Sequence, residues 1–320
     1  MTTAMRRSIG MITATALLVA GCSAGQGDPK VALTVGDAKV STVEQIQRTL
    51  NDLLATNQAV QDQARQHKLD QVSRGIVGQQ AINQLAADAA RRLGIQITDA
   101  QAEAAIPVLT GPGATQSDPF QSIVDAAFQP KDLARARLAL AEVGRRALGR
   151  SSVTFDAVVL QDADAAVELA RKIAENPAQS TALIQAAPEA MGEPFLNSVF
   201  GPEAALQDPS NLLTLAASPY YNVPAGEVIA TRLTGNQGGY LVLFMKARRA
   251  VTPPAEVTIP ELKPVELAQI GQGQLTLLAS VVPVQPNPRF GKWDPVTLKV
   301  VSGEEATNIS TVFQAKSTQP

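Results

Sequence analysis

Few side chains in this 320-residue sequence could take part in covalent or metal chemistry, and the first of them is its only cysteine, Cys22. A thiol can act as a nucleophile, bind a metal, form a disulfide or accept a lipid. With no second cysteine, the chain cannot close a disulfide of its own. The only histidine, His67, lies in a polar, glutamine-rich stretch, where we expect a solvated surface position rather than a catalytic or metal-binding one. No CxxC, HExxH, GxSxG, phosphate-loop or dinucleotide motif is present, so neither a metal nor a cofactor is predicted.

The sequence before Cys22 is typical of an export signal. Arg6 and Arg7 precede an apolar run from Ile9 to Ala20, and small residues lie just before the cysteine. The apolar run has about a dozen residues, fewer than the roughly 20 that a membrane-spanning helix needs. Residues 1–21 are therefore predicted to be a signal peptide, and residues 22–29 a glycine-rich tether.

The segment LVAGC, from Leu18 to Cys22, resembles the lipobox of bacterial lipoproteins. This resemblance implies that a diacylglycerol is attached to the sulfur of Cys22 and that cleavage makes Cys22 the first residue. Because two acyl chains hold a protein stably in a bilayer, the expected location is the extracytoplasmic face of a cell membrane, with the lipid bilayer as a partner. The alternative is a secreted protein with a free or buried thiol.

Composition limits the classes of partner. Beyond the signal peptide the chain has 25 basic and 29 acidic residues, a net charge of −4. Nucleic-acid binding depends on basic surfaces and on aromatic stacking, so this charge and the aromatic content of 4% argue against nucleic acid. No nucleotide is expected either. An apolar content of 45% can build a packed core without disulfides, in a chain long enough for two domains.

Residues 30–150 are predicted to form a mostly helical lobe. A short hairpin is expected at its start, because Val31, Leu33 and Val35 alternate with smaller residues before a Gly-Asp turn. Ser41 and Glu44 match a capping box for the first helix. Apolar spacing and helix-end residues predict further helices at 69–93 (ended by Gly94), 98–109 (capped by Thr98 and Gln101), 118–128 and 131–149.

Residues 151–250 change to a β-α-α-loop-α-β-β order, which makes the expected fold class α+β. The predicted elements are a buried strand at 153–160, helices at 162–176 and 177–192, a loop with Phe195 and Phe200, a helix at 211–218, and two strands within 226–249 joined by a turn at 235–238. Residues 251–320 begin with a proline-rich boundary and contain a helix at 264–282 and a strand pair within 287–301. They are too few to fold alone, so we expect them to pack on the N-terminal lobe.

These segments together resemble the SurA/PrsA-type extracytoplasmic chaperones, in which a helical lobe precedes a parvulin-type prolyl isomerase domain. The stretches that carry the resemblance are VALTVGDAKVST, RRLGIQITDAQAEAAI, TFDAVVLQDADAAVELARKI and YNVPAGEVIATRLTGNQGGYLVLFMKARR, within about Lys30 to Arg249. The resemblance implies a helical lobe completed by the C-terminal segment, with a parvulin-like domain inserted between them. It also implies that the protein binds unfolded or exported polypeptides.

The chain departs from the parvulin pattern where catalysis takes place. Asp156 and Leu241 occupy the positions matched to the two histidines of the parvulin proline pocket, and Tyr221 falls where the family has an aromatic wall. Rotation about an X-Pro bond has a barrier of about 20 kcal/mol, and lowering it needs groups aimed at the twisted amide. A single carboxylate is poorly suited to this, so we expect a holdase without isomerase turnover. The candidate peptide-binding residues are Phe155, Asp156, Phe195, Phe200, Tyr221 and Leu241.

Three alternatives stay open. The protein could be an active isomerase in which Asp156 is the catalytic residue. It could instead be a lipid-anchored adaptor that binds one specific partner in the cell envelope. The aromatic residues Phe195, Phe200 and Tyr221 could also be core residues rather than a surface for clients, because aromatic side chains usually pack inward.

Overall fold

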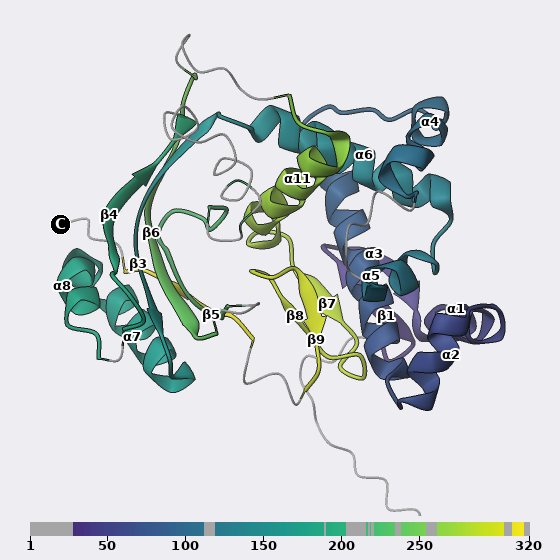
Figure 1. Cartoon of the computed structure of the whole chain (residues 1–320), viewed down its shortest axis with the longest axis horizontal. Helices are drawn as coiled ribbons and strands as arrows, with labels where there is room; N and C mark the ends of the chain where they lie inside the picture. The colour runs from purple at the N-terminus through teal and green to yellow at the C-terminus, as the bar shows by residue number, and fades with distance from the viewer. Residues whose placement is uncertain are drawn as a thin grey trace, which may run out of the picture.

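In the computed structural model, the described residues are 28–111, 119–188, 190–202, 216, 218, 221–233, 238–253, 261–303 and 309–316, so Cys22 lies outside them. The chain mixes α-helices and β-strands, as the α+β class requires. Its antiparallel sheets have the strand orders β2-β1-β7, β10-β5-β6-β3-β4 and β8-β9. Figure 1 shows the five-stranded sheet at one end of the molecule and the N-terminal helices at the other, with α11 between them. Within these residues no helix is both long and apolar enough to cross a membrane.

The N-terminal hairpin forms as predicted, from β1 (Val31–Val35) and β2 (Ala38–Thr42). The predicted capping box of Ser41 and Glu44 is wrong by one residue. Helix α1 (Val43–Thr56) is capped by Thr42, whose Oγ1 accepts from the Gln45 N–H at 3.2 Å, while Gln45 Oε1 accepts from the Thr42 N–H at 2.8 Å. Ser41 still belongs to the hairpin strand, and its hydroxyl is 2.6 Å from Gln80 Oε1 on another helix.

The polar stretch after α1 contains a short helix that the apolar pattern did not reveal. Helix α2 (Gln58–Arg65) buries only Val60 and begins at Asn57, whose side chain accepts from the Ala59 N–H at 2.9 Å. The remaining helices of this region lie within two residues of their predicted bounds or inside them. They are α3 (Leu69–Arg92), α4 (Asp99–Leu109), α5 (Pro119–Asp125) and α6 (Pro130–Ala147).

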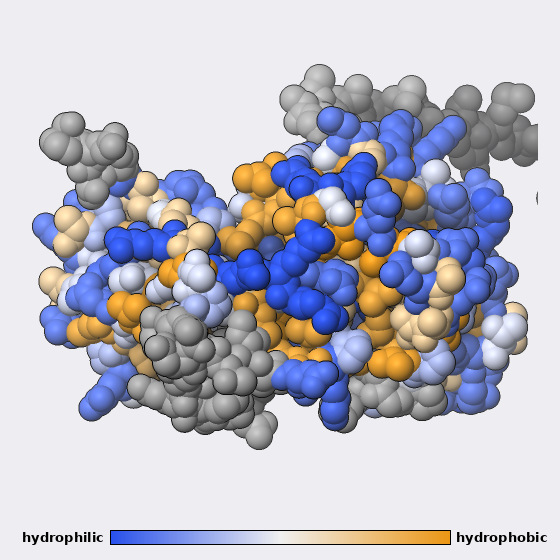
Figure 2. Space-filling model, turned by 90° about the horizontal axis from the view of Figure 1, so that it is seen from above, coloured by the Kyte–Doolittle hydropathy of each residue, from blue (hydrophilic) through white to orange (hydrophobic). Residues whose placement is uncertain are grey.

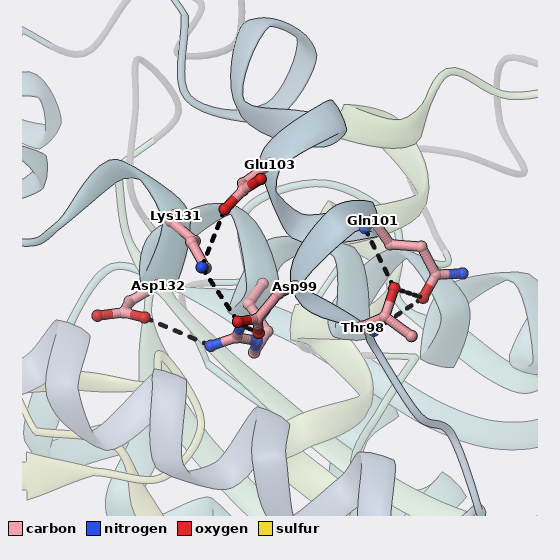
Figure 3. A network of polar contacts seen from close by, with 7 residues as sticks. Thr98, Asp99, Gln101, Glu103, Lys131 and Asp132 are labelled. Carbon is pink, nitrogen blue, oxygen red and sulfur yellow. Dashed lines mark hydrogen bonds and ion pairs between the residues drawn. The ribbon is translucent and has the colours of Figure 1, made fainter.

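Helix α4 is held against α6 near both of its ends. At its start, Lys131 Nζ lies 3.2 Å from Asp99 Oδ2 and 3.0 Å from Glu103 Oε1, beside the predicted Thr98–Gln101 cap (Figure 3). The hydrogen bond from Lys131 lowers the pKa of Asp99. At its end, the Leu109 carbonyl accepts a hydrogen bond of 2.8 Å from Arg137 Nη1. This attachment fixes the separation of the two helices.

The C-terminal segment contacts both the N-terminal lobe and the middle region. Helix α11 (Pro264–Ala279) crosses α6, and β7 (Val284–Pro286) pairs with β1. The predicted strand pair forms as β8 (Lys292–Asp294) and β9 (Lys299–Val301), and β9 lies against α3. One part departs from expectation: β10 (Thr311–Gln314) pairs with β5 of the five-stranded sheet instead of packing on the N-terminal lobe.

The middle region is built on the five-stranded sheet. Its elements are β3 (Ser151–Leu160), α7 (Ala163–Glu175), the 3-10 turn Pro177–Gln179, α8 (Ser180–Gln185), β4 (Phe195–Phe200), β5 (Glu227–Arg232) and β6 (Tyr240–Ala250). The predicted loop with Phe195 and Phe200 is wrong, because these residues begin and end a strand paired with β3. The predicted helix at 211–218 and the turn at 235–238 lie largely outside the described residues.

Each face of this sheet has its own apolar cluster. On one face, Val158 and Phe244 pack with Leu169 and Ile173 of α7. On the other face, Ala157, Leu241 and Leu243 pack with Val223 and with Val296 of the C-terminal segment. Figure 1 shows α7 and α8 on the outer side of the curved sheet. A residue of β3 therefore points either toward these helices or toward the rest of the molecule.

Candidate functional site

Asp156, the candidate catalytic residue, is fully buried on the helix-covered face of the sheet. Its Oδ2 accepts hydrogen bonds from the hydroxyls of Ser180 at 2.7 Å and Thr181 at 3.0 Å, and its Oδ1 accepts one from the Asn197 N–H at 2.6 Å. Lys246 Nζ lies 2.6 Å from the same Oδ2. This carboxylate therefore joins β3 to α8, β4 and β6.

The surroundings of Asp156 keep it ionised. Burial opposes its charge, but the hydrogen bonds from Lys246, the Asn197 N–H and Ser180 outweigh it and hold the pKa of Asp156 below its usual value. Lys246 is shared with the Asn197 side chain, whose Oδ1 accepts from Nζ at 2.6 Å. A carboxylate with this many fixed partners has little capacity left for a substrate.

Asp156 and Leu241 do not face a common pocket, contrary to the prediction. In the β3–β6 register, Asp156 lies opposite Phe244 and Leu241 lies opposite Val159. Phe244 belongs to the helix-side cluster, whereas Leu241 belongs to the cluster on the other face. The residues of β3 in the cluster of Leu241 include Val153, Ala157 and Val159, but not Asp156. Asp156 is therefore wrongly placed to act with Leu241 on one ligand.

The other candidates on that second face are largely core residues. Tyr221 donates its hydroxyl to the Ser151 carbonyl, and its ring meets the Phe200 ring edge-on at a centroid distance of 5.5 Å. The guanidinium of Arg248 lies 5.2 Å from the Tyr221 ring centre. Burial lowers the pKa of Arg248 and raises that of Tyr221. These contacts agree with the alternative that Phe200 and Tyr221 are packing residues.

Phe195 is the exception among the aromatic candidates. Its side chain is 60% exposed, and its ring lies 6.3 Å from that of Phe155 in a tilted arrangement. Val199 on the same strand is 68% exposed. Strand β4 is an outer strand of the sheet and carries no charged residue, so it presents an apolar, neutral edge.

A cavity of about 460 Å³ lies in the other half of the molecule. Its walls come from α3, α5, α6, α11, the end of α4 and the turn between β8 and β9. Sites for small ligands commonly have volumes of roughly 300–1,000 Å³. The lining residues are Gln71, Arg74, Gly75, Gly78, Gln79, Ile82, Leu109, Phe120, Gln121, Val124, Arg137, Leu140, Val265, Ala268, Gln269, Gln272 and residues 297–300.

The apolar part of the cavity is placed by the tight packing of α3 against its neighbours. Gly75 lets the side chains of Phe120 and Val124 approach, since a Cβ at this position would lie 2.6 Å from Val124 Cγ2. Ile82 and Leu140 add further buried apolar surface. A ligand with apolar side chains would gain about 25 cal/mol for each Å² it buries here.

The polar part of the cavity consists mainly of amides. Gln79 is buried, donates to Asn83 Oδ1 at 2.8 Å and accepts from Gln121 Nε2 at 3.1 Å. In the described part of the chain, the side chains of Gln71, Gln269 and Gln272 make no hydrogen bond to another protein group, and those of Gln71 and Gln269 are exposed to solvent. Each of these amides can both donate and accept, as a peptide backbone does. The cavity can thus pair with a backbone while burying apolar side chains.

Sequence reasoning missed this cavity because its lining is distributed over six elements. The only local signal is the pair Gly75 and Gly78 within the long helix α3, where glycine is otherwise unfavourable.

The chain matches no protein-family model and no curated protein sequence.

Proposed function

We propose that this protein is a lipid-anchored extracytoplasmic chaperone that holds unfolded exported polypeptides without isomerising their prolyl bonds. The observation that carries the proposal is the cavity between α3, α6 and α11, which joins apolar walls to unpaired amide side chains. Figure 2 also shows hydrophobic residues toward the middle of one face of the molecule, with strongly hydrophilic residues among them. Such a surface is suited to chains whose apolar side chains are exposed.

The chemistry of the cavity favours binding without strict sequence preference. Amides recognise the backbone, which all clients share, and the apolar wall accepts different aliphatic or aromatic side chains. Ordering a flexible client opposes binding, so the affinity per unit area is modest and exchange is fast. Rapid exchange suits a holdase, which must release its client for folding.

The position of Asp156 supports the part of the proposal that no prolyl bond is isomerised. Asp156 is ionised, buried and bound to Ser180, Thr181, Asn197 and Lys246. It lies on the face opposite to Leu241 and Tyr221, so it cannot assist rotation of an amide placed beside them. The active isomerase that uses Asp156 remains the competing proposal. It requires that the protein accelerates cis–trans isomerisation of the prolyl bond in a reporter peptide, and that Asp156→Ala removes this acceleration.

A SurA/PrsA-type architecture is part of the proposal. In it, residues 30–150 and 251–320 form one helical body, and residues 151–250 form an inserted parvulin-like domain. The contacts of α11 with α6, of β7 with β1 and of β9 with α3 support the first statement. The antiparallel sheet covered by α7 and α8 on one face supports the second. Strand β10 would then link the two bodies.

The lipid anchor is proposed from the sequence around Cys22. The tether of residues 22–29 reaches about 28 Å when fully extended, so the cavity would work close to the membrane surface. Chains emerging from the membrane would meet it at a high effective concentration. Metabolic labelling with a fatty acid should mark the wild-type protein, and Cys22→Ser should abolish the label.

The holdase proposal is tested with the mature chain carrying Cys22→Ser. It should delay the aggregation of a chemically unfolded client at stoichiometric concentration. Gln272→Trp, which fills the cavity, should remove this effect, whereas the matched change Gln47→Trp on the exposed face of α1 should not. Equal protection by the two variants, or no protection by the parent chain, would refute the proposal.

The exposed edge of β4 favours a second candidate, an adaptor for one envelope partner. A neutral strand edge with Phe195 and Val199 exposed can accept a strand from another protein. In this case crosslinking in cells should trap one partner in a fixed ratio, and Val199→Lys should abolish the crosslink. The holdase predicts many trapped proteins and no effect of Val199→Lys.

A further inference from the structure

We infer that the cavity recognises the carboxylate at the C-terminal end of a polypeptide whose last residues are apolar. This inference rests on the proposed function and adds to it the part of the client that is bound. It is carried by the charges and the unused hydrogen-bond donors of the cavity lining.

The charged residues of the lining are all cationic. Arg74, Arg137 and Lys299 line the cavity, and no aspartate or glutamate is among the described residues that do so. Arg137 is already neutralised, because its Nη2 lies 2.6 Å from Asp125 Oδ2 and its Nη1 is bound to the Leu109 carbonyl. Arg74 is paired with Asp70 through Nη1 alone, and Lys299 is the remaining cation.

Most of the N–H donors of the Arg74 guanidinium are unused among the described contacts. The Arg74 side chain is 14% exposed, and only Nη1 is engaged, at 2.8 Å from Asp70 Oδ2. Asp70 is 61% exposed and one turn away on α3, so its charge is largely solvated. A guanidinium offers five N–H donors in a planar fork that matches a carboxylate.

Lys299 supplies a second cation from a different element. It lies on β9 at an exposed position of the lining, and its ammonium has no ion-pair partner in the described part of the chain. The amides of Gln269 and Gln272, which make no hydrogen bond to another described residue, add further donors without adding a competing anion. A carboxylate accepts hydrogen bonds only, so it satisfies this surplus better than a neutral amide.

The size of the cavity favours a chain end over an internal segment. A volume of about 460 Å³ accommodates a ligand of a few residues. With an internal segment bound, two stretches of the client chain would have to pass through the cavity opening. With a chain end bound, only one stretch would. The apolar side chains before the carboxylate would then contact Phe120, Val124 and Leu140. A fatty acid shares the carboxylate and the apolar body, so the experiment must separate the two sources.

The test measures binding of a fluorescent hexapeptide with apolar C-terminal residues to the mature Cys22→Ser chain. The peptide is prepared with a free C-terminus, with an amidated C-terminus, and with an amidated C-terminus plus an internal glutamate. We expect the free acid to bind about tenfold more tightly than either amide at low salt. Salt should reduce this difference.

Variants assign the effect to the cavity. Arg74→Gln and Lys299→Gln should each reduce the preference for the free acid, and Arg74→Lys should keep part of it. Arg48→Gln is the matched control, because Arg48 also faces an acid one turn before it but lies on α1 away from the cavity. It should leave the preference unchanged.

The outcomes separate the inference from the proposed function. Equal binding of acid and amide by the parent chain overturns the inference while leaving the holdase intact, and this comparison needs no variant that must fold. Displacement by decanoate with no binding of any peptide also overturns it, in favour of a fatty acid. If the chain binds no peptide and delays no aggregation, the proposed function itself fails.

Discussion

Lys246 Nζ and Asp156 Oδ2 lie 2.6 Å apart, and this ion pair joins β6 to β3 beneath helix α8. The Asp156 side chain has no solvent exposure, and that of Lys246 is 22% exposed. The same carboxylate also accepts from Ser180, Thr181 and the Asn197 N–H. Asp156, the catalytic candidate in the sequence, thus has the contacts of a structural residue that holds the middle sheet to α8.

Asp156→Asn should therefore reduce stability rather than an enzymatic activity. Removing one partner of a buried ion pair leaves the other charge unpaired and costs about 3 kcal/mol. Denaturant unfolding of the mature chain should show this loss. The matched change Asp164→Asn, at an exposed position of α7, should stay within about 0.5 kcal/mol of the parent. Similar stability of the two variants would contradict a structural role for Asp156.

The same ion pair predicts a loss of stability in acid. The folded-state pKa of Asp156 is lowered from its usual value of 3.8, so the folded protein binds this proton less readily than the unfolded chain. The contribution is complete above pH 3.8 and is lost as the pH falls through the folded-state value. The difference in melting temperature between the parent and Asp156→Asn should therefore shrink from pH 5 to pH 2. A difference that is constant over this range would contradict the assignment.

The pKa of Glu227 is shifted in the direction opposite to that of Asp156. Burial raises the pKa of Glu227 above 4.5, although Gln314 Nε2 on β10 donates to its Oε1 at 2.7 Å. At neutral pH the buried charge opposes folding, and this cost disappears once the pH falls below 4.5. Glu227→Gln should therefore raise the melting temperature at pH 7 and lose this advantage at pH 4. Glu193→Gln, at an exposed position, is the control and should show no such pH dependence.

Local signals predicted many of the elements. The cap of α4 at Thr98 and Gln101 and the left-handed Gly94 after α3 depend on neighbouring residues, and both form as predicted. Strand β4 was missed because its six residues carry no charge and alternate weakly. Helix α2 was missed because it buries one residue only.

The face of the sheet on which Asp156 lies could not be predicted from the sequence. Irregular pairing of β3 lies between Phe155 and Ala157 toward β4, and between Thr154 and Phe155 toward β6. A shift of one residue moves a side chain to the opposite face, and the positions of such irregularities depend on tertiary packing. The cavity was equally hidden, because residues as distant as Arg74 and Lys299 meet only in the folded chain.

The close packing of α11 on α6 at Gly271 affects the cavity, because Leu140 is both the contact of Gly271 and a lining residue. Gly271 lies in α11 where this helix crosses α6, and a Cβ here would overlap the Leu140 carbonyl, as one at Gly144 would overlap the Leu267 carbonyl. Gly271→Ala should force the helices apart and destabilise the protein by about 1–3 kcal/mol. It should also weaken client binding, because Leu140 and Ala268 line the cavity.

Gly78→Ala is the control for helix propensity. A Cβ at Gly78 would lie 3.6 Å from the Val300 nitrogen, an ordinary contact, so alanine can be accommodated in α3. Because alanine is favoured over glycine in a helix, this variant should be more stable than the parent by about 0.5–1 kcal/mol. Thermal unfolding of Gly271→Ala and Gly78→Ala should show these opposite changes in stability. If Gly271→Ala were also stabilised, the close crossing of α6 and α11 would be wrong, and with it the wall that both helices give to the cavity.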